Sequence, residues 1–247
     1  MDSLLRQWQA AGREFRHESR SIFYRDEGAG PVLLCMHGYP TASWDWHRVW
    51  PRLVQRYRLI AVDMLGFGFS DKPRDISYTI AAQATLHEQL LASLGIEDVH
   101  VLAHDYGDTV TQELMARQLE RIQHGGSGLR LRTVSLLNGG LFPESHHARP
   151  IQTLLRSPLG PLLVRALNER AFRRSFCAIF GADTQPDDDE LSRCWALINH
   201  NGGRLNMGRL LHYIDERKRH RQRWIGALVE APMPVQFIVG LDDPVSG

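Results

Sequence analysis

The six residues 103–108, with the sequence AHDYGD, constrain the fold of this chain more than any other segment. They follow the apolar run Val99–Leu102 and open a helical pattern over Thr109–Leu119, which predicts a sharp turn from a strand into a helix. The residues two positions before and after Asp105 are Ala and Gly, small enough to let the backbone bend tightly. We therefore expect Asp105 at the tip of the turn, with its side chain lifted above a sheet.

A carboxylate at such a tip favours one kind of chemistry. An aspartate side chain is ordinarily ionised at neutral pH, so it attacks carbon directly and forms an alkyl ester. Asp105 therefore favours epoxides or carbon–halogen compounds over carboxylic esters as substrates. In the alternative interpretation, the carboxylate only complements the positive end of the following helix, which is the role we expect of Asp108 in the first helical turn.

Composition limits the remaining possibilities. The chain has 247 residues, 43% of them hydrophobic, which suits one sizeable α/β domain with an insertion. Lys and Arg together number 29 against 28 Asp and Glu, so no net charge favours a nucleic acid or a membrane as partner. Three cysteines at unrelated spacings argue against disulfides and a zinc site. The sequence shows neither a secretion signal nor a membrane span, so we expect a cytoplasmic protein.

Short apolar runs alternate with helical patterns along the chain, which is typical of a largely parallel sheet flanked by helices. We predict an edge strand at Ile22–Arg25 and five further strands at Pro31–Met36, Tyr57–Val62, Val99–Ala103, Leu131–Leu137 and Pro234–Val239. From Gly140 to about Leu228 the strand pattern stops, and helical segments separated by prolines take over. We interpret 141–228 as an inserted helical cap, 1–140 as the first part of the core, and 229–247 as a core strand with an acid loop.

Three further motifs lie at the ends of predicted strands. His37-Gly38-Tyr39-Pro40 ends the first strong strand. Gly66–Pro73 fails as a dinucleotide fingerprint, because Asp71 occupies the place of the third glycine, and we interpret it as a structural turn. Asp243 follows the last strand, where an acid that orients a catalytic histidine is expected, although it would equally cap a turn before Pro244.

Together these motifs resemble the α/β-hydrolase superfamily, and within it the epoxide hydrolase and haloalkane dehalogenase branch with an aspartate nucleophile. The segments Gly66–Pro73, His104–Asp108, Leu137–Glu144 and Arg217–Leu228 are most similar to the mesoderm-specific transcript group of that branch. The resemblance implies an α/β-hydrolase fold with a mostly parallel sheet and an inserted cap. It also implies that Asp105 and Asp243 are catalytic, and that the backbone N–H groups of Tyr39 and Tyr106 form an oxyanion hole.

Differences from this branch bear on the substrate. Dehalogenases of the branch carry a tryptophan after the nucleophile and often an asparagine after the His-Gly pair, whereas this chain has Tyr106 and Tyr39 there. Epoxide opening instead needs a proton donor, commonly two cap tyrosines, and Tyr213 is the one tyrosine of this predicted cap. Tyr213 is otherwise an ordinary residue of an amphipathic helix. Trp44 either lines the pocket behind the oxyanion loop or fills the core.

No histidine follows Asp243, since the last one in the sequence is His220, and neither His37 nor His104 is a convincing replacement. We therefore expect a fragment that lacks the final strand and helix of the fold, with an ester on Asp105 that persists because water attack has no activator. The function predicted for the full-length form is that of an epoxide-hydrolase-like enzyme.

Two alternatives remain open, a non-catalytic ligand-binding or scaffold protein and a haloalkane dehalogenase. We expect a small electrophile as the partner, no metal and no organic cofactor, and we interpret the basic run Arg217–Trp224 as a solvated helix face rather than a nucleic-acid site.

Overall fold

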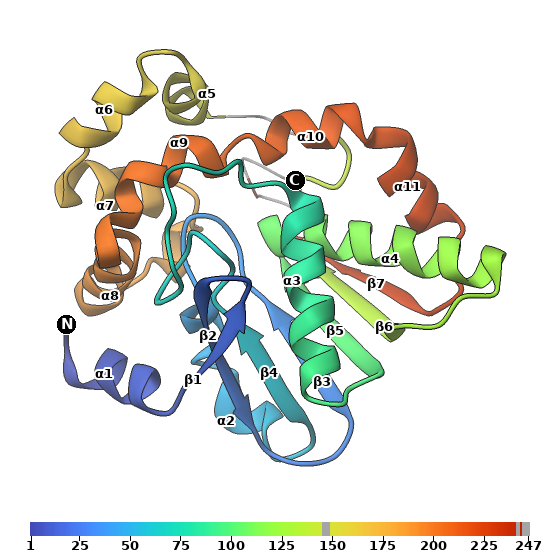
Figure 1. Ribbon diagram of the computed structural model, residues 1–247. Helices are drawn as coiled ribbons and strands as arrows, with labels where there is room; N and C mark the ends of the chain where they lie inside the picture. Colours follow the sequence, from blue (N-terminus) through green and yellow to red (C-terminus); the bar gives the residue numbers. More distant parts are fainter. Residues whose placement is uncertain (145–148, 241–242, 244–247) are drawn as a thin grey trace.

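A seven-stranded sheet forms the centre of the computed structural model, which describes residues 1–144, 149–240 and 243 (Figure 1). Its strands are β1 (Arg13–His17), β2 (Arg20–Glu27), β3 (Val32–Met36), β4 (Arg58–Val62), β5 (Asp98–His104), β6 (Arg130–Leu137) and β7 (Val235–Ile238). They lie side by side in the order β1-β2-β4-β3-β5-β6-β7. The β1–β2 and β2–β4 pairs are antiparallel and the other four are parallel, which confirms the predicted mostly parallel sheet.

The five further predicted strands agree with β3 to β7 to within one residue at each end. The prediction that Ile22–Arg25 forms an edge strand was wrong, because its strand β2 lies between β1 and β4. Pattern reasoning missed β1 since its residues, Arg-Glu-Phe-Arg-His, include no run of apolar side chains and most of the strand is exposed. An edge strand needs no second buried face, so its sequence carries little signal.

Helices cover both faces of the sheet (Figure 1). On one face, alternate side chains of the central strands pack with α3 (Ile80–Ser93), α4 (Tyr106–His124) and α11 (Arg221–Val229). On the other face they pack with α1 (Ser3–Ala10), the 3₁₀ helix η1 (Ser43–Trp46) and α2 (Trp50–Leu53). The two buried clusters are each built on the period-two alternation of strands enclosed on both sides.

A group of helices between β6 and β7 lies beyond the carboxyl ends of the parallel strands (Figure 1). Its members are α5 (Pro150–Arg156), α6 (Gly160–Ala166), α7 (Glu169–Cys177), η2 (Ala182–Thr184), α8 (Asp188–Asn199), η3 (His200–Asn206), α9 (Met207–Leu210) and α10 (Tyr213–Arg219). The helix that follows, α11, instead packs along α4. The division into cap and core segments stays a prediction, as does the placement of the protein in the cytoplasm. Over the described residues, no helix has both the length and the apolar character that crossing a membrane requires.

Candidate active site

Strand order creates a switch point at the carboxyl ends of two parallel strands. The strands β3 and β5 are parallel neighbours, with Met36 paired to Ala103, but the chain continues from β3 to β4 on one side and from β5 to β6 on the other. The loops that follow β3 and β5 therefore diverge, which leaves an opening at their carboxyl ends. The His37–Pro40 loop and Asp105 both lie there, as expected from their positions in the sequence.

The turn after β5 has the strained backbone that a sharp elbow requires. Asp105 has φ 48° and ψ −101°, a backbone conformation that residues other than glycine rarely adopt. Gly107 makes the turn possible, because a Cβ at this position would lie 2.6 Å from the carbonyl oxygen of Met36. Its N–H donates to the carbonyl of His37 over 3.1 Å, so α4 begins in direct contact with the end of β3. The elbow therefore fixes Asp105 relative to the neighbouring loop.

Three groups surround the Asp105 carboxylate, whose side chain is 19% exposed. The backbone N–H of Tyr39 donates to its Oδ2 over 3.0 Å. The Tyr213 hydroxyl donates to its Oδ1 over 3.4 Å, and Nη2 of Arg217 lies 3.7 Å from the same oxygen. The structure thus brings together residues from three segments that lie far apart in the chain, and it gives the two carboxylate oxygens different surroundings.

The loop after β3 presents a backbone donor to this carboxylate. His37 is fully buried, accepts from the N–H of Met64 through Nε2 and therefore donates to the Gly38 carbonyl through Nδ1. Burial lowers the pKa of His37, which keeps the ring neutral in this role. A Cβ on Gly38 would lie 2.7 Å from Nδ1 of His104, so only glycine lets the loop approach the elbow closely. The loop in turn directs the Tyr39 N–H toward Asp105.

The second predicted oxyanion donor, the N–H of Tyr106, belongs to the first residue of α4. Such amides have no acceptor within their own helix, so this one is left for a ligand. The Tyr106 ring is fully buried and meets the ring of Tyr213 edge-on at 4.8 Å. The oxyanion role of both amides stays a prediction.

Tyr213 begins α10 and reaches down onto the elbow. Its side chain is 1% exposed, and its ring lies between those of Tyr39 and Tyr106. Burial raises the pKa of the Tyr213 phenol well above its usual value, and the negative charge of Asp105 acts in the same direction. The phenol therefore keeps its proton at neutral pH, as a proton donor must.

Arg217 is a residue of this site that the sequence interpretation missed. The basic run was interpreted as a solvated helix face, but the Arg217 side chain is 1% exposed and Trp224 is also buried. Arg217 donates through Nε to Oγ1 of Thr109 over 2.8 Å and through Nη2 to the Asp105 carbonyl over 3.1 Å. The signal that would have found it is the four-residue spacing from Tyr213, which places both residues on one face of a helix.

Two ionisable groups flank Asp105 in the chain. Asp108 is fully buried, and within the described structure neither of its carboxylate oxygens has a hydrogen-bond partner. Burial raises the pKa of Asp108 well above its usual value, so the neutral acid is favoured. His104 is different: burial alone would lower its pKa, but the carboxylates of Asp45 and Asp105 raise it to about 9. His104 is thus protonated at neutral pH and is unsuited to act as a base.

Asp243 lies beside Asn138, the residue that follows β6. Nδ2 of Asn138 donates to Oδ2 of Asp243 over 2.7 Å, and its Oδ1 accepts from the N–H of Gly240. The adjacent carbonyl, that of Leu137, accepts from the N–H of Asp105. Asn138 therefore connects the loop after β7 with the elbow, while the catalytic role of Asp243 stays a prediction. The other residues of the predicted acid loop, Leu241, Asp242 and Pro244, lie outside the described residues.

The structure places Trp44 in the core. Its side chain is 4% exposed, stacks on His47 with ring centres 4.0 Å apart, and packs edge-on against Trp8. Its indole N–H donates to Glu190 over 2.9 Å. Of the two placements considered from the sequence, this is core filling, and a substrate contact for Trp44 stays a prediction.

The Gly66–Pro73 segment is a structural turn, as predicted. Oδ2 of Asp63 accepts from the N–H of Phe69 over 2.7 Å, close to Gly68, whose positive φ suits glycine. The hydroxyl of Ser70 bridges the Asp63 carbonyl and the N–H of Phe23. These contacts fix the turn against the sheet.

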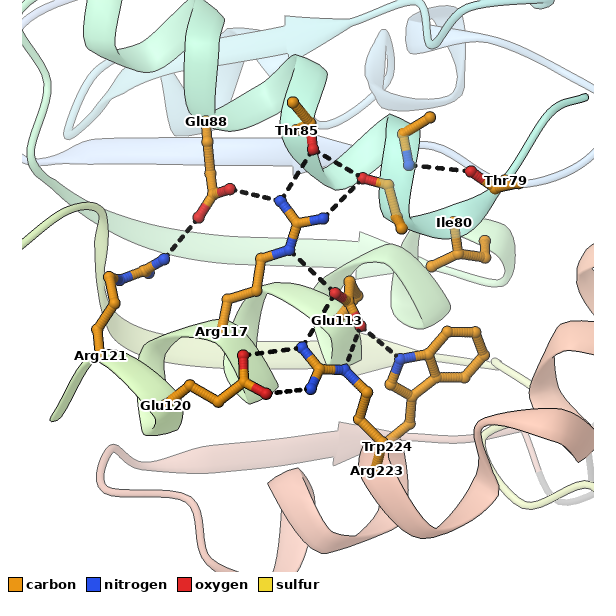
Figure 2. Close-up of polar contacts among 12 residues, drawn as sticks. Thr79, Ile80, Thr85, Glu88, Glu113, Arg117, Glu120, Arg121, Arg223 and Trp224 are labelled. Atoms are coloured by element: carbon orange, nitrogen blue, oxygen red, sulfur yellow. Dashed lines mark hydrogen bonds and ion pairs between the residues drawn. The ribbon is translucent and has the colours of Figure 1, made fainter. Parts of the chain in front are cut away.

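A network of ion pairs holds α11, and with it α10, against the core (Figure 2). The buried carboxylate of Glu113 on α4 accepts from Nε of Arg117, Nε of Arg223 and the indole N–H of Trp224, each over 2.8–2.9 Å. Arg117 also donates to Glu88 on α3 over 2.6 Å. Because α10 leads directly into α11, this network fixes the end of the segment that carries Tyr213 and Arg217.

Comparison with known proteins agrees with this architecture. A family model described as alpha/beta hydrolase fold matches residues 31–247. The mesoderm-specific transcript protein of Mus musculus is 41% identical over 251 residues, which cover 98% of this chain and 74% of the mouse protein. A protein of Mycobacterium tuberculosis (strain ATCC 25618 / H37Rv), provisionally named hydrolase LipZ, is 40% identical over 243 residues, covering 98% of this chain and 83% of that protein.

Solved structures share the same fold. A haloalkane dehalogenase, DatA from Agrobacterium tumefaciens C58, superposes with a TM-score of 0.74 at 21% identity, covering 92% of this chain and 77% of DatA. The epoxide hydrolase CorEH superposes with a TM-score of 0.72 at 19% identity, covering 93% of this chain and 82% of CorEH. At such identities the likeness shows the fold alone, so chemistry has to be argued from the site.

Proposed function

This chain belongs to the α/β hydrolase fold family, and from that premise we propose that it is a hydrolase of the epoxide hydrolase type. The observation that supports this most strongly is the buried Tyr213 hydroxyl, 3.4 Å from Oδ1 of Asp105. A nucleophile and a proton donor at one point suit a substrate whose carbon is attacked while its oxygen takes up a proton. The substrate class is a small electrophile with a strained ether.

In the first step, Oδ1 of Asp105 attacks an epoxide carbon, and the bond from that carbon to the ring oxygen breaks. The ring oxygen leaves as an alkoxide and takes the Tyr213 proton, which gives an alkyl ester on Asp105 and a phenolate on Tyr213. Oδ1 is the attacking oxygen because it lies on the side of the donor, whereas Oδ2 already accepts from the Tyr39 N–H.

In the second step, water adds to Cγ of the ester, and Oδ2 becomes the tetrahedral oxyanion. The N–H groups of Tyr39 and Tyr106 stabilise that charge. Collapse then breaks the bond from Cγ to the former Oδ1, so the diol departs with an aspartate oxygen. Of the two protons of the water, one returns to the Tyr213 phenolate and the other goes to the departing alkoxide, which leaves Asp105 as a carboxylate. An epoxide and one water are consumed for each diol.

Dehalogenation, the activity of the DatA neighbour, is the alternative chemistry for a nucleophilic aspartate in this fold. A halide departs without a proton and is instead cradled by N–H donors of side chains. Tyr39 and Tyr106 carry hydroxyls rather than such N–H groups. Tyr213 therefore favours the epoxide, and halide release from haloalkanes is the outcome that would favour the dehalogenase.

Isotope labelling of oxygen tests this mechanism, because hydrolysis of the ester transfers an oxygen atom from water to Asp105. We expect styrene oxide in ¹⁸O-labelled water to leave either an alkyl adduct or one ¹⁸O atom on the peptide that contains Asp105, measured by mass spectrometry after digestion. Asp105→Asn should abolish both, whereas the exposed Asp75→Asn should change neither. A diol whose new oxygen comes straight from water, with Asp105 unlabelled, contradicts the mechanism. If the protein neither reacts nor becomes labelled, the non-catalytic binding protein is favoured.

A further inference from the structure

Arg217 is in contact with both groups that react in the proposed function, and the following inference rests on that function. We propose that Arg217 is a positioning residue that makes Tyr213 a competent proton donor by stabilising the phenolate left behind. Arg217 is buried beneath Tyr213 and does not face the substrate, so it acts through the tyrosine and the aspartate.

The guanidinium lies beside both groups, which also contact each other directly. Tyr213 and Arg217 lie one helical turn apart on α10, and the guanidinium carbon lies 4.5 Å from the centre of the tyrosine ring. The bonds to Thr109 and to the Asp105 carbonyl hold its fork flat over the first turn of α4. One rigid group thus sets the distance between the phenol and the carboxylate.

The charge balance of the first step explains why a cation is needed there. Before the attack the negative charge is on Asp105, with Nη2 of Arg217 3.7 Å from Oδ1. After the attack Asp105 is a neutral ester, and the negative charge is on the Tyr213 phenolate, whose ring lies against the same guanidinium. Arg217 therefore has a counter-charge in both states. Without it, proton transfer would leave an unpaired charge in a buried site, which is strongly unfavourable.

The remaining nearby carboxyl group, that of Asp108, does not compete for this charge. It is fully buried and favours the neutral acid. Within the described structure, Nη1 of Arg217 has no hydrogen-bond partner, so the cation is not neutralised by a closer pair. Electrostatic support from Arg217 is thus directed toward Asp105 and Tyr213.

A purely structural role, in which Arg217 only ties α10 to α4, makes a different prediction. Loss of the contact between α10 and α4 slows every substrate by the same factor, because it reduces the fraction of molecules with a correctly formed site. Loss of phenolate stabilisation instead slows a substrate more when its departing alkoxide is more basic, because such an alkoxide depends more on receiving a proton. Two epoxides of similar size separate these cases, 1,2-epoxypropane and 3,3,3-trifluoro-1,2-epoxypropane, since fluorine stabilises the departing alkoxide.

The experiment measures the rate of ester formation on Asp105 by rapid quenching and intact-mass spectrometry. We expect Arg217→Gln to slow 1,2-epoxypropane by roughly tenfold or more and the trifluoro substrate much less. Tyr213→Phe should show the same selectivity with a larger loss, on the order of 10²-fold or more for an absent general acid. In the double variant, Arg217→Gln should add nothing to Tyr213→Phe.

The controls keep the inference separable from the proposed function. Lys218→Met removes an exposed cation from the same helix and should leave both rates unchanged. If Arg217→Gln does not fold, Arg217→Lys, which keeps the charge but not the fork, should still slow 1,2-epoxypropane more than its trifluoro analogue. Equal slowing of both epoxides, or additive losses in the double variant, would overturn the inference. Absence of any ester in the unmodified protein would instead overturn the proposed function.

Discussion

At the scale of single residues, the close approach of the elbow backbone to the end of β3 predicts that Gly107 cannot be replaced without loss of stability. Gly107→Ala places a Cβ 2.6 Å from the carbonyl oxygen of Met36, and a backbone atom of the central sheet does not move aside easily. We expect a loss of about 1–3 kcal/mol in the free energy of unfolding, as for other overpacked sites. Ester formation should fall as well, because the shift moves Asp105 away from Tyr39.

The control for Gly107→Ala is Gly226→Ala, measured by the same urea unfolding. Gly226 lies inside α11, and a Cβ there meets nothing within 4 Å. Alanine is the better helix former, so this variant should gain roughly 0.5–1 kcal/mol. Equal effects of the two substitutions would contradict the argument from close approach.

The charge on His104 gives a second residue-scale prediction. Its pKa in the folded state is about 9, above the ordinary value of 6.5, because the carboxylates of Asp45 and Asp105 outweigh burial. Its stabilising contribution is therefore complete below pH 6.5 and is lost as the pH rises through about 9.

We expect the stability advantage of the unmodified protein over His104→Asn to disappear over that interval, as measured by urea unfolding at several pH values. An advantage that grows with pH would show the opposite shift. An NMR titration of the His104 ring gives the same pKa independently.

At the scale of helices and strands, the Glu113 network predicts unequal effects of two similar substitutions (Figure 2). The Glu113 side chain is 8% exposed and accepts hydrogen bonds from three residues, whereas Glu120 is 52% exposed and forms an ion pair with Arg223. Glu113→Gln removes one partner from buried ion pairs and should cost roughly 3 kcal/mol of unfolding free energy. Glu120→Gln should cost less than about 1 kcal/mol.

Unfolding measured at low pH checks whether the charge of Glu113 is the source of this stability difference. Burial alone raises the pKa of Glu113, but hydrogen bonds from Arg223, Trp224 and Arg117 lower it below the usual 4.5. Its contribution to stability is therefore present above pH 4.5 and is lost as the pH falls through the lowered value. The difference between the unmodified protein and Glu113→Gln should shrink in acid, and a constant difference would rule out the charge as its source.

The same scale shows what the sequence could predict. Strands β3 to β6 were predictable because each carries an apolar run with buried side chains, and β7 because its run is mostly apolar although most of it is exposed. Asp105 and Tyr39 were predictable because the elbow and the loop are local patterns at strand ends. Arg217 was not predicted, because its four-residue spacing from Tyr213 indicates a shared helix face, but a run of basic residues does not show that this face is buried against Asp105. Contacts between distant segments depend on packing that composition and spacing do not encode.

At the scale of the whole molecule, one apolar cluster runs from the sheet into the helices beyond its strand ends. Residues of β3 and β5 share it with Leu155, Phe172, Cys194, Ile198 and Met207 of those helices. The helices are short, and several large apolar side chains of these helices and their connections, such as Leu159, Leu162 and Phe180, stay exposed. We expect a layer of this kind to open more readily than the central strands.

The reactivity of the three cysteines can show whether these helices open before the central strands. Cys35 lies in β3, between β4 and β5, and is fully buried; Cys194 lies in α8 and is 3% exposed; Cys177 is half-buried. Burial raises the pKa of the Cys35 and Cys194 thiols, so both are protected in the folded state. We expect iodoacetamide to modify Cys177 first without denaturant. Cys194 should become reactive at a lower urea concentration than Cys35, as measured by peptide mass spectrometry. If Cys194 reacts first, the helices open before the sheet, as expected of the separate cap predicted over 141–228. If both thiols become reactive at the same urea concentration, helices and sheet unfold as one unit.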